Sequence, residues 1–198
     1  APMAKSLAER PAALRRGVMT LEEIGFEPTN FSQLKIPTGS NGAHELFSTF
    51  FDRMDRYGET RDFPGVKGPS YLGVHLRFGT VSIRRLVATA WQRTLHGSKG
   101  AAVWLSELVW RDFYFQILAN FPHVAHGSYK PEYDAILWEA GDHAQSLFKA
   151  WCEGQTGFPL VDAAMAQINQ TGYMHNRLRM VAGSFLVKDL GINWQWGE

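Results

Sequence analysis

Apolar residues recur at helical spacing along most of the chain. Between residues 44 and 57 they stand three or four positions apart, which places them on one face of a helix. They are Leu46, Phe47, Phe50, Phe51, Met54 and Tyr57. The same spacing predicts helices over about 82–97, 98–120, 143–152, 160–170 and 173–190. No alternating run of β-branched residues competes with this pattern, so we expect an all-α fold.

Residue types at the helix ends support these assignments. Ser82 and Ser98 precede two of the apolar patterns and are expected N-caps, while Gly97 and Gly191 follow two of them as expected stops. In the helix after Ser82 the inward positions are Leu86, Ala90 and Trp91.

Two stretches interrupt the helical pattern. Residues 1–43 carry four prolines and a Gly39–Gly42 cluster, and are interpreted as a tail and interdomain linker with one helical stretch at about 12–23. Residues 58–79 hold five glycines, Pro64 and Pro69, which predicts a loop with some ordered turns. The helical domain is therefore expected to span residues 44–198.

Composition excludes several classes of protein. With 198 residues, 45% of them hydrophobic, the chain can bury a core without a metal or a disulfide. Its single cysteine, Cys152, rules out an internal disulfide framework, a zinc ribbon and an iron–sulfur site. We find no signal-peptide pattern and no apolar stretch near the roughly 20 residues of a membrane span. We therefore expect a soluble, cytoplasmic protein in a reducing compartment, with no metal site. The seven Trp are either core residues or π surfaces for a flat ligand.

Charge is segregated along a nearly neutral chain. The net charge is +1, yet residues 61–100 carry seven basic residues against one acidic, whereas residues 101–166 carry three against eight. Such segregation can place a positive surface opposite a phosphate-bearing ligand or a nucleic-acid backbone. The alternative is that these side chains lie on solvated helix faces and pair with one another.

One predicted helix presents an indole, a carboxylate and a guanidinium side by side. Trp104, Glu107 and Arg111 are separated by three and four positions and share a face, with Trp110 at its rim. Glu and Arg seldom occupy an apolar face unless they are paired. The structural alternative is an intrahelical Glu107–Arg111 pair at the surface, worth about 0.3–0.5 kcal/mol.

Two further motifs carry polar groups. In the stretch 173–180, Asn176, Arg179 and Met180 share a helix face, and an arginine carried toward the core needs an acidic partner or an anionic ligand. The loop 65–73 combines glycines with Ser70 and either cradles a phosphate or forms an ordinary turn. The pair His123 and His126 lacks a surrounding carboxylate motif and is not a candidate metal site.

Taken in order, these motifs resemble the flavin-binding helical domain of the DNA photolyase and cryptochrome family. The resemblance covers about residues 39–198. It is carried by Arg61-Asp-Phe-Pro64, Trp104-Leu-Ser-Glu107-Leu-Val-Trp110-Arg111-Asp-Phe-Tyr, Thr156-Gly-Phe-Pro159-Leu-Val-Asp162-Ala-Ala-Met165, His175-Asn-Arg-Leu-Arg-Met180 and Phe185-Leu-Val-Lys188-Asp189-Leu190.

The resemblance implies an all-helical domain that holds a U-shaped FAD. In its reduced anionic form this cofactor is excited by light and passes an electron to a pyrimidine dimer flipped out of duplex DNA, which splits the dimer. The antenna chromophore is left open. The residues that match cofactor-binding positions are Tyr57, Ser70, Leu72, Gly73, Trp104, Glu107, Arg111, Asn176 and Arg179.

The resemblance also implies residues that touch DNA or carry electrons. Those matching contacts to the dimer are Glu107, Trp110, Asn176 and Met180, with Trp110 as a stacking platform and Glu107 as a hydrogen-bonding acid. Arg61 and Arg177 match contacts to the phosphate backbone, while Trp138 and Trp194 match the outer and middle members of an electron-transfer chain. Asn176 and Met180 favour a bacterial-type cyclobutane-dimer enzyme over a six-four enzyme.

The sequence also departs from the family pattern. Pro69 and Gly73 stand where Thr and Ser are usual, which removes two hydroxyl donors. The N-terminal antenna domain is missing, and the chain stops at Glu198, before the segment that supplies the acidic partner of Arg179. We therefore expect an excised piece of a longer repair enzyme, with FAD bound weakly or not at all and no activity by the piece alone.

Alternative functions and assembly states also follow from these expectations. One alternative is a cryptochrome photoreceptor that binds flavin without repair, and another is a helical DNA-binding or scaffold segment without flavin chemistry. The parent is expected to be a monomer acting on damaged duplex DNA. The excised piece is a candidate for self-association through exposed apolar surface.

Overall fold

The structure is a computed structural model that describes residues 11–12 and 17–198. The chain divides into two compact units, residues 1–35 and 36–198. Within the described part of the first unit, two 3-10 turns form, η3 (Glu22–Ile24) and η4 (Phe31–Gln33). Thr20 and Glu23 cap one another before η3, and Gly25, at φ 91°, ends that turn.

The helix predicted over 12–23 is not present where it is described. Residues 13–16 lie outside the described residues, and residues 17–20 form no helix. The physical reason is that the reciprocal bonds between Thr20 and Glu23 start a single turn only, and the left-handed Gly25 stops it before an α-helical turn is complete.

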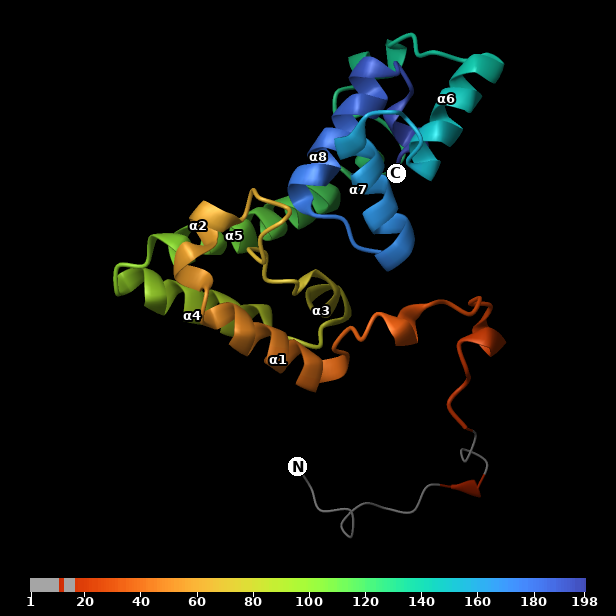
Figure 1. The fold of residues 1–198 in the computed structure, drawn as a ribbon. Coiled ribbons are helices and arrows are strands. Elements are labelled where there is room, and N and C mark those ends of the chain that lie inside the picture. Colours follow the sequence, from red (N-terminus) through yellow and green to blue (C-terminus); the bar gives the residue numbers. More distant parts are fainter. Residues whose placement is uncertain (1–10, 13–16) are drawn as a thin grey trace. The chain divides into compact units, whose positions relative to one another are not determined.

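The second unit is built from helices (Figure 1). They are α1 (Gly39–Phe51), α2 (Tyr57–Thr60), α3 (Gly73–Phe78), α4 (Ile83–Leu95), α5 (Lys99–Asn120), α6 (Gly141–Glu153), α7 (Pro159–Thr171) and α8 (Asn176–Ser184). A π-helix, η8 (Phe185–Asp189), continues α8. Single 3-10 turns complete the unit: η5 (Met54–Arg56), η6 (Pro122–Ala125), η7 (Pro131–Ala135) and η9 (Trp194–Trp196). No strand occurs among the described residues, and the predicted all-α fold is confirmed.

Helices α4 and α5 begin where the sequence predicts. The Ser82 hydroxyl accepts from the Arg85 amide at 3.4 Å, and the Ser98 hydroxyl accepts from the Ala101 amide at 3.1 Å. Both bonds satisfy amides that a helix leaves unpaired in its first turn. Leu86 and Ala90 are buried as predicted. The inward prediction for Trp91 is wrong, because it is 51% exposed: one position beyond Ala90 rotates the side chain by about 100° to the solvent side.

Two glycine-rich stretches fold differently from the prediction. Helix α1 begins at Gly39, five residues before the expected start, and its Gly42 packs on Pro37, where a Cβ would lie 2.4 Å from the Pro37 carbonyl carbon. Helix α3 lies inside the predicted loop 58–79, anchored by the buried Leu72 and His75. In both places tertiary packing overrides the weak helix propensity of glycine.

Each group of helices has its own core. Residues from α1 to α5 bury a cluster centred on Phe50, Met54, Leu86 and Trp104. Residues from α6 to η8 bury a second cluster, which includes Trp151, Met165, Leu178, Leu186 and Ile192. Figure 1 shows the two groups as separate bodies of helices, with α5 running from the first toward α8. None of the helices formed by the described residues is long and apolar enough to cross a bilayer.

Candidate functional site

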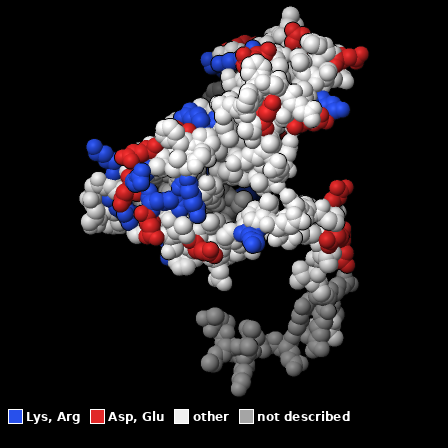
Figure 2. All heavy atoms as spheres, in the orientation of Figure 1, with Lys and Arg blue, Asp and Glu red and all other residues white. Residues whose placement is uncertain are grey.

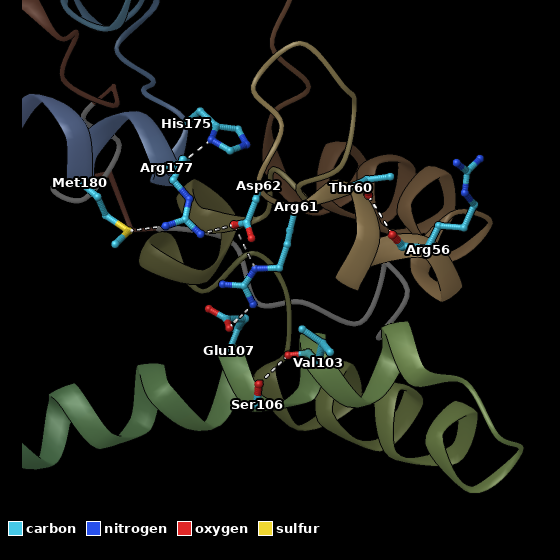
Figure 3. A network of polar contacts seen from close by, with 10 residues as sticks. All are labelled: Arg56, Thr60, Arg61, Asp62, Val103, Ser106, Glu107, His175, Arg177 and Met180. Carbon is cyan, nitrogen blue, oxygen red and sulfur yellow. Dashed lines mark hydrogen bonds and ion pairs between the residues drawn. The ribbon is translucent and has the colours of Figure 1, made fainter. Parts of the chain in front are cut away.

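A chain of alternating charges joins three segments that are distant in sequence (Figure 3). Glu107 comes from the middle of α5, Arg61 and Asp62 follow directly after α2, and Arg177 lies in the first turn of α8. Arg61 Nη1 donates to Glu107 Oε1 at 2.5 Å, and Arg177 Nη2 lies 2.7 Å from Asp62 Oδ1. Arg61 Nε lies 3.7 Å from the same Asp62 oxygen. The network therefore ties the first group of helices to the second.

Glu107 pairs across helices rather than along its own helix. The alternative of an intrahelical Glu107–Arg111 pair is wrong, because the Glu107 carboxylate is bonded to Arg61, 46 positions away. The Arg61 guanidinium also lies over the ring of Tyr57, 5.4 Å from its centroid. Although partial burial acts in the opposite direction, the bond to Glu107 and the neighbouring acids raise the pKa of Arg61. Arg61 is therefore held as a cation at this junction.

The other members of the predicted α5 face separate. Trp104 is 3% exposed and packs against Phe50, with ring centroids 4.8 Å apart, so core packing accounts for its position. Arg111 turns toward α3, donates to the Leu76 carbonyl at 3.4 Å and lies 4.6 Å from the centroid of Phe115. Trp110 is 52% exposed, as expected for a residue at the rim of this face.

Helix α8 carries the three candidates Asn176, Arg177 and Met180 in its first two turns. His175 is the N-cap, and its Nδ1 accepts from the Arg177 amide at 3.1 Å. Asn176 is exposed, and Met180 is 55% exposed with its sulfur 3.6 Å from Arg177 Nη1. The His175 cap thus fixes the helix turn that carries Asn176 and Arg177.

His175 itself is almost completely buried. It is 2% exposed, and its Nε2 is a buried atom without a hydrogen-bond partner among the described residues. Because Nδ1 accepts a bond, the neutral ring carries its proton on Nε2. Burial lowers the pKa of His175, and the Arg177 charge acts in the same direction, while the backbone of Arg61 and the charge of Asp62 oppose the decrease.

The Ser70 loop adopts a strained conformation beside α3. Tyr71 has φ 59°, a left-handed conformation that costs a residue with a Cβ about 1–2 kcal/mol. The loop is held in place by Arg53, whose Nη2 donates to the Pro69 carbonyl at 2.7 Å. The Ser70 hydroxyl accepts from the Leu72 amide at 3.4 Å. The left-handed Tyr71 and these two bonds fix the course of the loop ahead of α3.

Tyrosine rings link this loop to the segment before α8. The ring centroids of Tyr71 and Tyr173 lie 5.4 Å apart. Burial raises the pKa of Tyr173 to about 12, a rise that Tyr71 increases and the nearby Arg179 charge opposes. Burial likewise raises the pKa of Tyr57 to about 12. Tyr57 and Tyr173 therefore stay neutral at physiological pH.

Arg179 lines a largely apolar cavity of about 580 Å³ in the second group of helices. Trp151, Met165 and Trp194 also line this cavity. Arg179 Nε donates to the Met174 carbonyl at 3.1 Å, and no carboxylate of a described residue lies within ion-pair distance of its guanidinium. A cation beside indole and thioether groups suits a flat ligand that bears negative charge.

The remaining candidates lie at defined places. Trp138 and Trp194 line a common cavity of about 680 Å³, together with Tyr129 and Tyr133. The described residues include no cluster of three or more His, Cys, Asp or Glu side chains able to hold a metal ion.

Basic side chains gather, with acids between them, around α2 and α4 (Figure 2). Part of this charge is neutralised internally, since Arg93 is bonded to Asp55, and Arg56 Nε lies 3.8 Å from Glu59. The alternative of mutually paired helix faces therefore holds for these residues.

Sequence reasoning missed three residues of the site. Asp62 joins the two arginines, His175 caps α8, and Tyr71 contacts Tyr173 across the junction. Asp62 directly follows Arg61, and His175 directly precedes Asn176, so both stand inside motifs that the sequence analysis identifies. That position is the sequence feature that could have indicated a role for them. Nothing in the sequence indicates the positive φ of Tyr71.

Comparison with known proteins places these observations in a family. Residues 104–198 match the family model described as the FAD binding domain of DNA photolyase. A deoxyribodipyrimidine photo-lyase of Vibrio cholerae is 48% identical over 149 residues, which cover 74% of this chain and 31% of that protein. The chain spans about a third of the length of the curated relatives it matches.

Solved structures agree with this assignment. A class III photolyase from Agrobacterium tumefaciens superimposes with a TM-score of 0.81 at 35% identity, covering 90% of this chain and 38% of that one. A cryptochrome from Synechocystis gives a TM-score of 0.76 at 30% identity, covering 87% of this chain and 37% of that one.

Proposed function

Because the chain belongs to the DNA photolyase and cryptochrome family, we propose that it forms the flavin- and lesion-binding part of a light-driven DNA repair enzyme. The substrate would be a cyclobutane pyrimidine dimer in duplex DNA, split to its two pyrimidines. The observation that carries this proposal is the junction of Arg61, Glu107 and Arg177, which sets two cations and a carboxylate beside the exposed Trp110 and Met180. Cations suit a phosphate backbone, and an exposed indole suits an unstacked base.

The residues present fit FAD. Arg179 offers a cation without a carboxylate partner among the described residues, in a cavity walled by Trp151 and Trp194. In the strained loop at Ser70, the hydroxyl and backbone amides would bind phosphate oxygens. Tyr57, Leu72, Gly73, Asn176 and Arg111 are proposed as further contacts. Trp104 is proposed to act from the core beneath the site, because its ring is buried. When bound, reduced FAD supplies the photoexcited electron.

The protein side chains would hold and orient the lesion. Trp110 would stack on the flipped pyrimidines, and Glu107 would hydrogen-bond a base edge. Asn176 and Met180, exposed on one side of α8, would contact the dimer from the opposite element. Arg61 and Arg177 would contact the phosphates on either side. Trp138 and Trp194 would relay an electron toward the flavin when the cofactor needs to be reduced.

Illumination of a dimer-containing oligonucleotide tests the proposal. Protein from the complete reading frame, loaded with reduced FAD, should restore the pyrimidine absorbance of the oligonucleotide under blue light and not in darkness. Glu107→Gln should slow repair by about 10-fold, because the neutral amide loses the charged bond to Arg61 that fixes the position of residue 107 against the dimer. A protein that holds flavin firmly and yet repairs nothing would instead support the cryptochrome alternative, which the Synechocystis neighbour makes the specific competitor.

Damaged duplex DNA is the proposed partner, and a monomer in a reducing cytoplasm is the proposed state. Cys152, the one cysteine of the chain, is partly buried, and burial together with Glu153 raises the pKa of its thiol. A thiol in that state is a poor nucleophile, so no thiol chemistry enters the proposed reaction.

A further inference from the structure

Asp62 occupies the middle of the charge network. A single oxygen, Oδ1, lies 2.7 Å from Arg177 Nη2 and 3.7 Å from Arg61 Nε. Figure 3 shows its side chain between the two arginines, which come from segments on either side of the junction. The carboxylate is therefore shared by two guanidinium groups that would otherwise repel one another at short range.

Fold stability does not explain this arrangement. The Asp62 side chain is 48% exposed and that of Arg177 is 42% exposed. Ion pairs with this exposure contribute little to stability, because water screens them and two long side chains must be ordered to make them. The network does, however, fix where the two cations lie relative to each other.

Each arginine is also restrained at its own end. Arg61 is bonded to Glu107 and lies over the ring of Tyr57. Arg177 donates to the Met180 sulfur, and its amide is bonded to His175. Among these side chains of the described residues, Asp62 is the one that lies within ion-pair distance of both guanidinium groups. Without the Asp62 carboxylate, each arginine would keep its other contacts, but no shared partner would fix the distance between the two guanidinium groups.

We propose that Asp62 is a positioning residue, which holds Arg61 and Arg177 at the spacing at which they receive phosphates of the lesion-bearing DNA strand. This inference rests on the proposed function, which assigns the two arginines to the phosphate backbone. Asp62 itself carries a negative charge and gains nothing from the DNA. Its presence between two phosphate-binding cations lowers the local positive charge, so its benefit must come from geometry.

The proposal makes an unusual prediction, because removing an acid from a DNA-binding surface ordinarily strengthens binding. Asp62→Asn should instead weaken binding of a duplex that contains one thymine dimer by about 5- to 20-fold, the effect of losing one well-placed phosphate contact. The slope of the logarithm of affinity against the logarithm of salt concentration should fall by about 1. Fluorescence anisotropy of the labelled duplex, in the dark and over a salt series, measures both quantities.

Glu59→Gln is the matched control. Glu59 lies on α2, three residues before Asp62, and pairs only loosely with Arg56 at 3.8 Å, with both side chains more than three-quarters exposed. This substitution removes the same charge without touching the network. It should leave affinity unchanged or raise it by about twofold, for damaged and undamaged duplexes alike.

Asp62→Glu provides a variant without any change of charge. It keeps the carboxylate but displaces it by one methylene, so it should bind the damaged duplex with an affinity between wild type and Asp62→Asn. Equal gains in Asp62→Asn and Glu59→Gln, or wild-type binding by Asp62→Glu, would overturn the inference. If the wild-type chain binds neither the damaged nor the undamaged duplex, the proposed function is overturned, and with it this inference. That result differs from the two outcomes above, in which the wild type binds DNA and only the role of Asp62 fails.

Discussion

Among single residues, the site contains one strained backbone conformation and one buried polar atom without a hydrogen-bond partner among the described residues. Tyr71 has a left-handed backbone, and His175 is buried with an unpaired ring nitrogen. Such states persist only where the surrounding structure enforces them, and they gather at functional sites. Here both residues lie where the two groups of helices meet, since Tyr71 contacts Tyr173 and His175 caps α8.

Because Tyr71 has a left-handed backbone, we expect glycine at this position to give a more stable protein than alanine, the reverse of the usual order. Tyr71→Gly and Tyr71→Ala both remove the ring contact to Tyr173, so their difference reports the backbone alone. Glycine should be more stable than alanine by about 1 kcal/mol, because only glycine adopts φ 59° without cost. Urea unfolding of the two variants measures the difference.

The matched pair is Tyr133→Gly and Tyr133→Ala, at an exposed residue whose φ is not positive. There alanine should be the more stable by about 0.5–1 kcal/mol. The same order at both positions would show that Tyr71 carries no backbone strain.

His175 predicts a loss of stability in mild acid. Its folded-state pKa is lowered by burial, so its contribution to stability is present above the ordinary histidine value of about 6.5 and is lost as the pH falls toward the folded value. Protonation also breaks the bond that Nδ1 accepts from Arg177. His175→Asn keeps an N-cap acceptor but does not titrate, so its melting temperature should vary less than that of wild type below pH 6.5.

His143→Asn, at an exposed histidine of α6, serves as the control for that measurement. It should reproduce the wild-type pH profile. If His175→Asn and His143→Asn both follow the wild type, the buried ring is not the group responsible.

Among the secondary-structure elements, the local sequence predicts the long helices well, but it misses the helical segments that are rich in glycine. The caps at Ser82 and Ser98 form as predicted, because a hydroxyl next to the first turn acts within a few residues. Helix α3 and the first turn of α1 were interpreted as loops, because glycine and proline weaken helices in isolation. Those helices form because contacts distant in sequence, such as Gly42 against Pro37 and buried Leu72, stabilise them.

Glycine within helices therefore has two different roles, which substitution separates. A Cβ on Gly100, at the start of α5, would lie 2.2 Å from the Asp55 carbonyl oxygen and 2.3 Å from that of Met54. Gly100→Ala should cost about 1–3 kcal/mol, because the turn that carries Met54 must move away from α5. Chemical denaturation measures the loss.

Gly183→Ala is the natural comparison, because a Cβ on Gly183 in α8 meets nothing within 4 Å. It should raise stability by about 0.5–1 kcal/mol through helix propensity alone. A neutral Gly100→Ala would mean that α5 and the preceding turn pack less closely than described.

At the scale of the whole molecule, the candidate site depends on pairings that no local pattern contains. The sequence predicted that Glu107, Arg61 and Arg177 matter, and it predicted that a core-side arginine needs an acid or an anion. It could not show that Glu107 pairs with Arg61, or that Asp62 satisfies Arg177. Helical spacing reports neighbours three or four positions apart, whereas these partners meet only when α2, α5 and α8 are assembled.

The assembled fold also determines which tryptophans are buried in a core and which are exposed. Trp104 and Trp151 are buried and serve the two cores, whereas Trp110 is half exposed beside the charge network. Trp138 and Trp194 share a cavity wall. The indoles therefore divide into core residues and candidate contacts for base, flavin and electron, a division that composition alone left open.

We propose that an electron passes from light-excited reduced flavin to a pyrimidine dimer held at this junction. The most direct measurement is the fluorescence lifetime of reduced flavin in protein from the complete reading frame, with a dimer-containing duplex and with an undamaged duplex of the same sequence. Electron transfer to the dimer predicts a shorter lifetime with the damaged duplex only. Equal lifetimes with both duplexes, under conditions where each is fully bound, would contradict the claim.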